Sequence, residues 1–370
     1  MKIAIYGTGN RAHDFIEEII FLKCNCEVIY FVESKRTKNE YYDKPVIEAT
    51  SLDFTDFDYL VIAVEASRGI IEYLKELLPN YDDLKNKIIY EIDFYAMIPE
   101  VHRTMPYCSC ALTNGIKYIF SSHDRIIGES MLRTGINFAE NQINAFFELT
   151  DKYYGKKARN GYFFDVGANI GTTSIYVKKE LNPKLKIIGI EAGKDNYDLF
   201  RMNCIANNVE DIKVCHVAFA DAAGKAFFNE NTDNPGGSSV TKTNNIAGKN
   251  CETVNMITFD EFCEKEAINS GQIDYIWIDV EGFEVNVLKG AATVLKNKIP
   301  MMQEFNPFVY EEKGLLNEYL SIIEGTYNYY LDYSEYVKGK ELKRPVSEIR
   351  ELIEKMRAEK RVQTDLFFIV

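Results

Sequence analysis

Two short glycine-rich loops in this sequence have the residue types and spacing that bind a nucleotide-like ligand. The first runs through Gly7 and Gly9, and the second runs from Gly167 to Gly171. Each follows an apolar segment and precedes an acidic residue, Glu33 or Glu191, about 20 positions further on, as ribose-binding acids do. A glycine loop lets the backbone approach a ligand and directs a helix N-terminus at it. Such a loop can hold the pyrophosphate of a dinucleotide or the amino-acid end of S-adenosylmethionine (SAM).

An acidic residue before the second loop distinguishes these two chemistries. Asp165 stands two positions before Gly167. A carboxylate there would repel a pyrophosphate, whereas it can receive the ammonium group of a methionine moiety. Glu191 could accept hydrogen bonds from both ribose hydroxyls. The alternative is an ordinary glycine turn in which Asp165 caps a helix.

Elements that would position these residues follow from the hydrophobic pattern. Strands alternate with helices in two blocks, which predicts parallel sheets. We expect a domain over residues 1–100, a connector over 101–160 and a second domain over 161–370. The expected strands are residues 2–6, 27–32, 59–64, 87–92, 162–166, 186–190, 212–217, 225–228, 275–278, 301–305, 327–333 and 366–370. The polar, glycine-rich stretch 229–249 predicts a long loop.

Composition excludes several classes of function. The chain has 370 residues, with 43 Lys and Arg against 56 Asp and Glu, and a net charge of −13. This charge argues against a nucleic-acid partner, because phosphate backbones are bound by Lys and Arg. No apolar run approaches the roughly 18 residues of a membrane span, and the N-terminus does not resemble a signal peptide, so we expect a cytoplasmic protein. Of eight cysteines, Cys24/Cys26 and Cys108/Cys110 form C-x-C pairs, which we interpret as thiols and not as a zinc site.

The second block resembles the FkbM family of SAM-dependent methyltransferases between Phe164 and Glu304. The resemblance is carried by the runs 164–171, 196–199, 216–221, 257–260, 278–284, 287–291 and 303–304, together with Glu191 and Asn203. Most specific is Asp279-Val280-Glu281-Gly282-Phe283-Glu284 followed by Leu288-Lys289-Gly290-Ala291. The resemblance implies a class I, seven-stranded, Rossmann-like methyltransferase domain. With the strand–helix pattern of the first block, we expect an α/β protein in which a smaller Rossmann-like α/β domain precedes the methyltransferase domain.

The same resemblance implies a set of cofactor-binding residues and an activity. The methionine end of SAM would be lined by Asp165, Gly167, Asn169, Gly171 and Thr172, the ribose by Glu191, and the adenine edge by Ala218 and Phe219. The implied activity is O-methylation of a hydroxyl on a sugar or glycoconjugate. Two residues depart from the family pattern: Ala192 replaces a common proline, and Trp277 replaces a common lysine.

Three carboxylates come at the ends of the predicted strands 275–278 and 301–305. Asp279, Glu281 and Glu304 should converge at the carboxyl edge of the sheet, where ligands bind. We predict Asp279 as the base that removes the hydroxyl proton. Glu281 would orient the acceptor or share a divalent cation, Mg²⁺ or Mn²⁺, with Asp279 and Glu304. The alternative for Glu281 is that it caps a helix N-terminus.

The first block leaves more than one function open. Gly7, Gly9 and Glu33 meet the dinucleotide pattern, and about the first 95 residues resemble small nucleotide- or nucleotide-sugar-binding Rossmann domains of bacterial surface-sugar enzymes. This domain would recognise a nucleotide-linked sugar, or it would serve dimerisation in a homo-oligomer. Two other functions stay open for the whole chain: an NAD-dependent oxidoreductase that uses the first loop, and a non-catalytic binding or scaffold protein with a methyltransferase fold.

Overall fold

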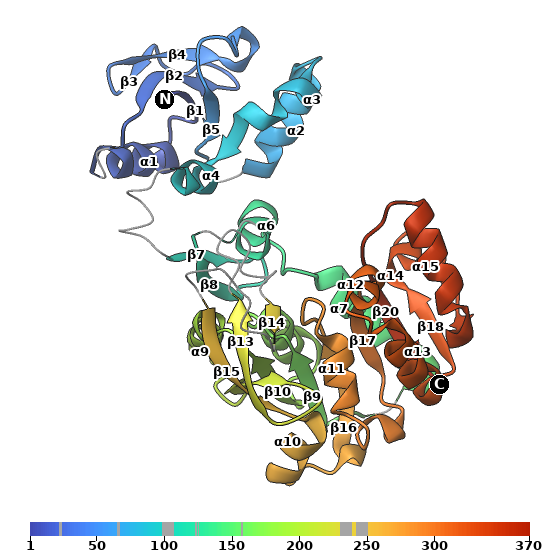
Figure 1. Ribbon diagram of the computed structural model, residues 1–370. Helices are drawn as coiled ribbons and strands as arrows, with labels where there is room; N and C mark the ends of the chain where they lie inside the picture. The colour runs from blue at the N-terminus through green and yellow to red at the C-terminus, as the bar shows by residue number, and fades with distance from the viewer. Residues whose placement is uncertain are drawn as a thin grey trace. The chain divides into compact units, whose positions relative to one another are not determined.

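The computed structural model describes residues 1–21, 24–64, 67–97, 107–122, 124, 126–156, 158–229, 239–241 and 251–370. The chain divides into two compact units (Figure 1). The first consists of Met1–Cys108 and Ser121–Gly135, and the second of Ser109–Phe120 and Ile136–Val370.

The first unit is built on a six-stranded sheet with the order β3-β4-β2-β1-β5-β6. All neighbouring strands are parallel except β3 and β4. Alternate residues of β1 point to opposite faces, so Ile5 packs with Phe15 of α1 and Tyr6 packs in the cluster that holds Leu74 of α2. The strands are β1 (Lys2–Tyr6), β2 (Glu27–Glu33), β3 (Glu40–Tyr41), β4 (Lys44–Glu48), β5 (Tyr59–Ile62) and β6 (Ile88–Tyr90). The helices are α1 (Asn10–Phe21), α2 (Ser67–Leu77), α3 (Tyr81–Leu84), α4 (Glu91–Ala96) and α6 (Ile127–Thr134), with the 3-10 turns η1 (Ala49–Ser51) and η2 (Lys85–Lys87).

The second unit is built on an eight-stranded sheet with the order β11-β10-β9-β16-β17-β20-β18-β19. The five strands from β11 to β17 are parallel, and β20 is antiparallel to both β17 and β18. The predicted seven-stranded methyltransferase fold is confirmed, and the two-residue strand β19 extends its edge. The strands are β9 (Tyr162–Val166), β10 (Lys186–Glu191), β11 (Lys213–His216), β16 (Ile273–Ile278), β17 (Met301–Phe305), β18 (Tyr329–Asp332), β19 (Arg344–Pro345) and β20 (Thr364–Ile369).

Helices cover both faces of this sheet. On one face, α10, α11, α13 and α15 enclose the largest apolar cluster of the chain's described part. On the other face, Phe146 of α7 contacts Trp277 and Phe367, while Phe200 of α9 lies against Gly189 of β10. The helices are α7 (Glu140–Tyr154), α8 (Thr172–Tyr176), α9 (Lys194–Ala206), α10 (Phe259–Lys265), α11 (Glu284–Lys289), α12 (Pro307–Glu312), α13 (Leu316–Thr326), α14 (Tyr333–Tyr336) and α15 (Ile349–Ala358). Short turns are η3 (Val177–Leu181), η5 (Ser270–Gln272), η6 (Leu295–Asn297) and η7 (Val346–Glu348).

Two small sheets complete the structure. The four-stranded sheet β12-β15-β13-β14 consists of β12 (Ala218–Phe219), β13 (Gly224–Asn229), β14 (Ser239–Thr241) and β15 (Cys251–Ile257). The second pairs β7 (Tyr107–Ala111) with β8 (Lys117–Ser121). Strand β14 falls inside the predicted loop 229–249, and most of that loop lies outside the described residues. Among the residues that the structure describes, no helix has the length and apolar character needed to cross a membrane.

Candidate functional site

The glycine loop of the second unit is shaped by close contacts within the protein. Gly167 and Gly171 have φ of 87° and 88°, and Asn169 between them has φ of 49°. A Cβ on Gly167 would lie 1.7 Å from the carbonyl oxygen of Asp279, and one on Gly171 would lie 2.1 Å from the ring of Phe200. Only glycine fits both positions, because the ends of β9 and β16 touch and α9 packs against the loop.

Glu191, the last residue of β10, connects the glycine loop to the turn at Gly193, which follows β10. One carboxylate oxygen accepts a hydrogen bond from the N–H of Asn169, and the other accepts from the N–H of Gly193, each at 2.8 Å. Burial raises the pKa of Glu191 to about 7, although these N–H groups oppose the rise. A carboxylate offers about four acceptor directions. The N–H of Ala192 is a third donor to this carboxylate, so about one acceptor direction is left for a ligand hydroxyl.

An unsatisfied polar atom in the loop indicates where a ligand fits. The side-chain Oδ1 of Asn169 is buried and has no hydrogen-bond partner among the described residues. A buried acceptor left unpaired costs about 1–3 kcal/mol, and a ligand ammonium or hydroxyl would satisfy it. Together with the remaining acceptor direction of Glu191, this atom fits the amino-acid and ribose parts of SAM.

Asp165 makes its hydrogen bonds to α8. Its Oδ2 accepts hydrogen bonds from the N–H of Ser174 at 3.1 Å and from the Ser174 hydroxyl at 2.6 Å. Burial raises the pKa of Asp165 to about 6, and the two bonds from Ser174 oppose that rise. This arrangement is the one that the helix-capping alternative describes. Binding of a ligand ammonium by Asp165 stays a prediction.

The two residues predicted for the adenine edge, Ala218 and Phe219, belong to different apolar clusters in the structure. Ala218 lies in a small apolar cluster with Ala192, Val280 and Phe283, close to the ends of β10 and β16. The side chain of Phe219 instead enters the main core, where its ring lies 4.7 Å from that of Phe259. Phe219 can therefore offer only its backbone to a ligand. The methionine-end residue Thr172 is also buried, and its carbonyl accepts a hydrogen bond from Asn137 at 3.3 Å.

An aromatic pair beside Glu191 was not predicted as part of the site. Tyr197 of α9 stacks on His216 of β11, with ring centroids 5.2 Å apart. The Nε2 atom of His216 lies 3.0 Å from the carbonyl oxygen of Ala192. In the sequence, Tyr197 stands within a family motif, but nothing in the motif shows that its ring meets His216.

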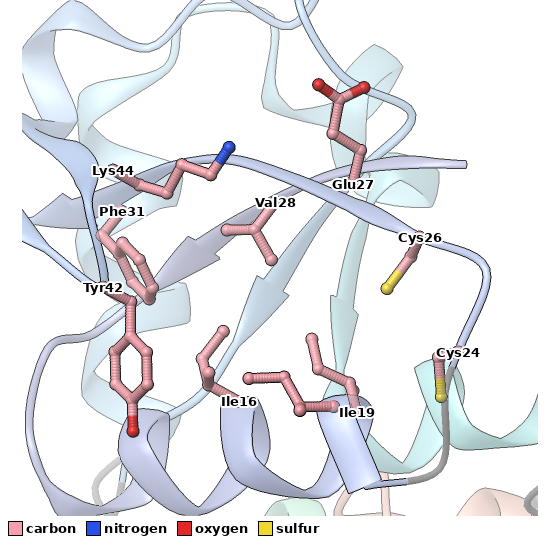
Figure 2. Close-up of a pocket in the computed structure, with 10 residues that line it drawn as sticks. Ile16, Ile19, Cys24, Cys26, Glu27, Val28, Phe31, Tyr42 and Lys44 are labelled. Carbon is pink, nitrogen blue, oxygen red and sulfur yellow. The ribbon is translucent and has the colours of Figure 1, made fainter.

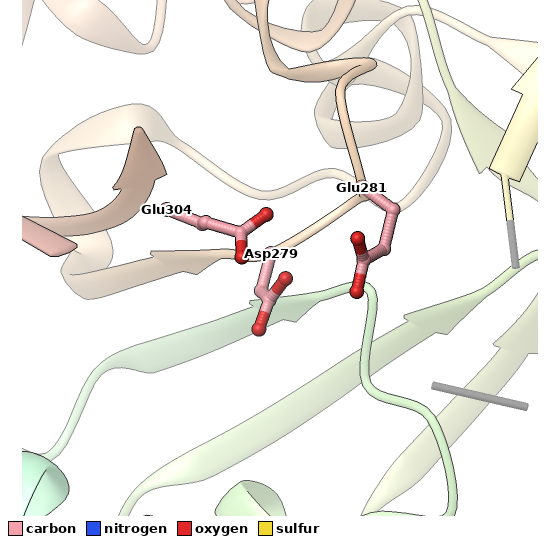
Figure 3. Close-up of side chains that lie close together, drawn as sticks. All are labelled: Asp279, Glu281 and Glu304. Carbon is pink, nitrogen blue, oxygen red and sulfur yellow. The ribbon is translucent and has the colours of Figure 1, made fainter. Parts of the chain in front are cut away.

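The three predicted carboxylates do come together at the carboxyl edge of the sheet, and Figure 3 shows them. One oxygen from each of Asp279, Glu281 and Glu304 lies within 4.8 Å of the others. We call these three residues the acidic cluster. Asp279 is exposed, Glu281 is partly exposed and Glu304 is buried. Glu304 also accepts a hydrogen bond from Gln363 at 2.8 Å.

Mutual repulsion and burial keep protons on the acidic cluster. Surrounding protein atoms raise the pKa of Asp279 well above its ordinary value, and the charge of Glu281 raises it further. Burial raises the pKa of Glu281 to about 7, and burial together with Asp279 raises that of Glu304. Asp365 of β20, which pairs with Glu304, adds a fourth carboxyl, with a pKa that burial raises to about 7. Adjacent carboxylates cannot all ionise, so they share protons or a cation.

The loop that carries Glu281 is held in an unusual conformation. Glu281 has φ of 51°, in the left-handed region, and Gly282 follows with φ of 84°. Glu284 accepts hydrogen bonds from the N–H groups of Val280 at 3.2 Å and Gly282 at 3.1 Å, while Lys313 donates to the carbonyl of Gly282 at 2.7 Å. Helix α11 begins at Glu284 with Phe283 as its N-cap residue, so Glu281 does not occupy the N-cap position that the helix-capping alternative requires. The carboxylate of Glu281 is left for the site.

The first glycine loop also brings its predicted residues together. Glu33 accepts hydrogen bonds from the Thr8 hydroxyl, from the Thr37 N–H at 2.5 Å and from the Thr37 hydroxyl. Burial alone would raise the pKa of Glu33, but these bonds outweigh it and hold the pKa below its ordinary value. A Cβ on Gly7 would lie 2.4 Å from the carbonyl oxygen of Ala63, whereas one on Gly9 would meet nothing within 4 Å.

A pocket of about 430 Å³ lies elsewhere in the first unit. Figure 2 shows apolar side chains of α1 and β2 lining it, with Cys24 and Cys26 at one side. Cys26 and Glu27 are at the amino end of β2, whereas Glu33 is at its carboxyl end. The pocket is therefore distinct from the glycine loop at Gly7.

Comparisons with known proteins found one matching family and several similar solved structures. A family model for the methyltransferase FkbM domain matches residues 165–356, and no curated protein matches the chain. Among solved structures, an O-methyltransferase from Bacillus cereus in complex with SAH is 14% identical and covers 63% of this chain and 82% of its own, with a TM-score of 0.29. A putative O-methyltransferase from Klebsiella pneumoniae is 15% identical and covers 67% and 89%, with a TM-score of 0.31. Precorrin-6y C5,15-methyltransferase from Geobacter metallireducens is 9% identical and covers 62% and 89%, with a TM-score of 0.33.

The family match confirms the predicted resemblance. It begins at Asp165 and includes the second glycine loop, Glu191 and the acidic cluster. The chain belongs to the FkbM family of methyltransferases, and it is a SAM-dependent methyltransferase.

Proposed function

We propose that this methyltransferase acts on a hydroxyl group of a sugar or glycoconjugate. The observation that carries the proposal is the acidic cluster, which lies where β16 meets the glycine loop: the Asp279 carbonyl touches Gly167. When bound, SAM supplies an already activated methyl group. The protein must then position the acceptor and take its hydroxyl proton.

The acidic cluster suits the removal of that proton. A carboxyl with a pKa near 7, as Glu281 has, is ionised in part at neutral pH and binds a proton strongly enough to act as a base. Asp279 has an exposed carboxyl within 4.8 Å of Glu281 and is our candidate for direct contact with the acceptor. In this proposal the acceptor oxygen gains the methyl group and its proton passes to a carboxylate oxygen of the cluster.

The charge of the cluster also supports a hydroxyl-rich acceptor without acidic groups near the reacting oxygen. Ionised carboxylates only accept hydrogen bonds, and a sugar offers several hydroxyl donors on one face. A phosphate or carboxylate beside the reacting hydroxyl would be repelled by the ionised carboxylate that the cluster needs in order to act as a base. This favours a neutral or amino sugar at the point of reaction.

The test is methyl transfer from SAM to a panel of neutral, amino and acidic sugars and their glycosides, followed by mass spectrometry. We expect a methylated product from the neutral or amino members, and Asp279→Asn should lower its rate by about 10²- to 10⁴-fold. Asp198→Asn, which changes an exposed acid on α9 that pairs with Lys194, should leave the rate unchanged. A product only from acidic sugars, or full activity of Asp279→Asn, would contradict the proposal.

We also propose that the acidic cluster takes Mg²⁺ or Mn²⁺. Its support is the convergence of three oxygen ligands, which these hard cations prefer, and the repulsion that a cation would relieve. Calorimetric titration with each ion should show binding to the wild type and at least a tenfold loss in Glu281→Gln. If neither ion binds and chelator-treated protein keeps its methyltransferase activity, the cation is excluded and the cluster works by sharing protons.

For the first unit we propose a nucleotide site at the loop of Gly7 and Gly9. Its support is the open space at Gly9. A Cβ there would meet no atom of the described protein within 4 Å, so packing does not explain the glycine. A ligand that approaches the backbone closely would explain it. Titration with a nucleoside diphosphate sugar should show binding that Gly9→Ala weakens. If no nucleotide binds and light scattering shows a dimer, the unit serves oligomerisation instead.

A further inference from the structure

Two buried asparagines, one in the last turn of α9 and one at its C-cap, lie four residues apart and face strand β8. Asn203 and Asn207 are 0% and 3% exposed. Asn203 accepts a hydrogen bond from the N–H of Ile119 at 2.7 Å and donates to the Ile119 carbonyl at 3.0 Å. Asn207 does the same with Lys117, accepting at 2.9 Å and donating at 2.6 Å. Each side-chain amide therefore pairs with both backbone groups of one strand residue.

The spacing explains why this pairing works. Four residues along a helix advance about 6 Å, and two residues along a strand advance about 6.6 Å. Amides at positions 203 and 207 can thus match residues 117 and 119 of β8 in the way a neighbouring strand would. Strand β8 is fastened to α9 by side chains instead of by a backbone ladder.

The two asparagines differ in their remaining hydrogen bond. The side-chain nitrogen of Asn203 also donates to the carbonyl of Ile170, at 3.0 Å, and Ile170 is part of the SAM-binding loop. The corresponding nitrogen of Asn207 donates to the carbonyl of Asn203 within α9, at 2.8 Å. Of the two asparagines, it is Asn203 that connects β8 to the loop.

A second link from β8 reaches the other side of Gly171. Tyr118, between the two paired residues of β8, is fully buried, and its hydroxyl lies 3.2 Å from the carbonyl oxygen of Thr172 and 2.7 Å from Oδ1 of Asn137. The carbonyls of Ile170 and Thr172 are therefore both held from outside the loop. Left-handed backbone at Asn169 is disfavoured by itself and persists where its surroundings fix it.

We infer that Asn203 and Tyr118 are positioning residues of the methyl-donor site, and that β8 is a working part of that site. Strand β8 precedes residues 165–356, where the family model matches. By fixing the carbonyls on both sides of Gly171, these residues keep the Asn169 N–H directed at Glu191 and the Asn169 side chain directed at the ligand. Donor affinity then depends on β8 as well as on the loop.

The test compares Asn203→Ala with the matched control Asn207→Ala in the full chain. Binding of S-adenosylhomocysteine is measured by calorimetry, and exchange of the backbone amides of residues 166–172 by hydrogen–deuterium mass spectrometry. Both variants lose the pairing with β8, so both should have a lower melting temperature. We expect Asn203→Ala to raise the Kd at least tenfold and to speed exchange in the loop, and Asn207→Ala to keep the Kd within twofold of the wild type.

Equal effects of the two variants on the Kd, or a wild-type Kd in Asn203→Ala, would overturn the inference. If Asn203→Ala does not fold, Tyr118→Phe decides, because it keeps the buried ring and removes only the hydroxyl near Thr172. That variant should raise the Kd severalfold and speed loop exchange, and unchanged values would overturn the inference. A wild-type protein that does not bind S-adenosylhomocysteine at all would contradict the assignment of the donor site itself.

Discussion

The N–H of Asn169 donates a hydrogen bond to the carboxylate of Glu191 at 2.8 Å, and this contact joins two ends of the donor site. Asn169 belongs to the loop that would hold the amino-acid end of SAM, and Glu191 would hold its ribose. A substitution that displaces the loop should therefore also displace the carboxylate of Glu191. A substitution of Glu191 should remove the hydrogen bond that holds the N–H of Asn169. We expect a substitution at either Asn169 or Glu191 to weaken the binding of both the amino-acid end and the ribose of SAM.

The two glycine loops should respond differently to the same substitution. Gly167→Ala places a methyl group 1.7 Å from the Asp279 carbonyl at a φ that alanine disfavours, which should cost about 3 kcal/mol or more. The expected fall in melting temperature is roughly 6–12 °C. Gly9→Ala, with nothing within 4 Å of the new atom, should change it by no more than about 4 °C. Thermal unfolding of both variants checks this, and similar losses for the two would contradict the packing described for Gly167.

The loop of Glu281 should depend on Lys313. Lys313→Met removes the hydrogen bond to the Gly282 carbonyl while keeping most of the side-chain volume. We expect about tenfold slower methyl transfer and an unchanged Kd for S-adenosylhomocysteine, because the acidic cluster and not the donor loop is displaced. Lys296→Met, at an exposed lysine, is the control. A weaker donor Kd in Lys313→Met would instead assign this lysine to the donor site.

Methyl transfer should depend on pH through the acidic cluster. The base must be ionised. Surrounding protein atoms raise the pKa of Asp279, the predicted base, well above its ordinary value, and burial and Glu284 raise that of Glu281 to about 7. The rate should therefore rise about tenfold per pH unit up to pH 7 and should not fall above it. Glu281→Gln should shift or remove this limb of the profile, measured at saturating SAM. A rate that falls between pH 6 and 8 would exclude the cluster as the base.

Stability of the ligand-free protein should move in the opposite direction. Burial raises the pKa values of Asp165 to about 6 and of Glu191 and Asp365 to about 7, above the ordinary values of 3.8 for Asp and 4.5 for Glu. The folded chain then binds more protons than the unfolded chain across pH 5–7, so a rise in pH favours unfolding. We expect the melting temperature to fall from pH 5 to pH 8, and to fall less in Glu191→Gln. A rise over that range would show that these carboxyls are not buried as described.

The parts of the fold that depend on short sequence patterns could be predicted from the sequence. Strands β9, β10, β16 and β17 are apolar runs with a glycine or an acid at or next to their carboxyl ends, and parallel strands bring such ends to one edge. This is why the acidic cluster and the approach of Glu191 to the second loop follow from the pattern. The start of α10 is also encoded locally, because Thr258 and Glu261 form a capping box there.

Other parts depend on contacts that no local pattern contains. Asp365 joins the acidic cluster only because β20 pairs antiparallel with β17, and the expected strand 366–370 left this residue outside. Strand β15 pairs with β13 across a long polar segment, so its neighbour is not visible in the sequence. Asn203 belongs to a family motif, but its bonds to β8 arise from packing between distant segments. Phe219 was expected at the adenine edge, and its side chain lies in the core because the register of β12 turns it inward.

The central claim is that SAM binds at Glu191 and the loop from Gly167 to Gly171. Its most direct test is calorimetric titration of the wild type, Glu191→Gln and Glu33→Gln with S-adenosylhomocysteine and then with NAD⁺. Hydrogen bonds to a charged group contribute about 1.5–3 kcal/mol, so Glu191→Gln should weaken S-adenosylhomocysteine roughly 10- to 150-fold, while Glu33→Gln leaves it unchanged. Binding of NAD⁺ alone, sensitive to Glu33→Gln and indifferent to Glu191→Gln, would contradict the account and move the active site to the first unit.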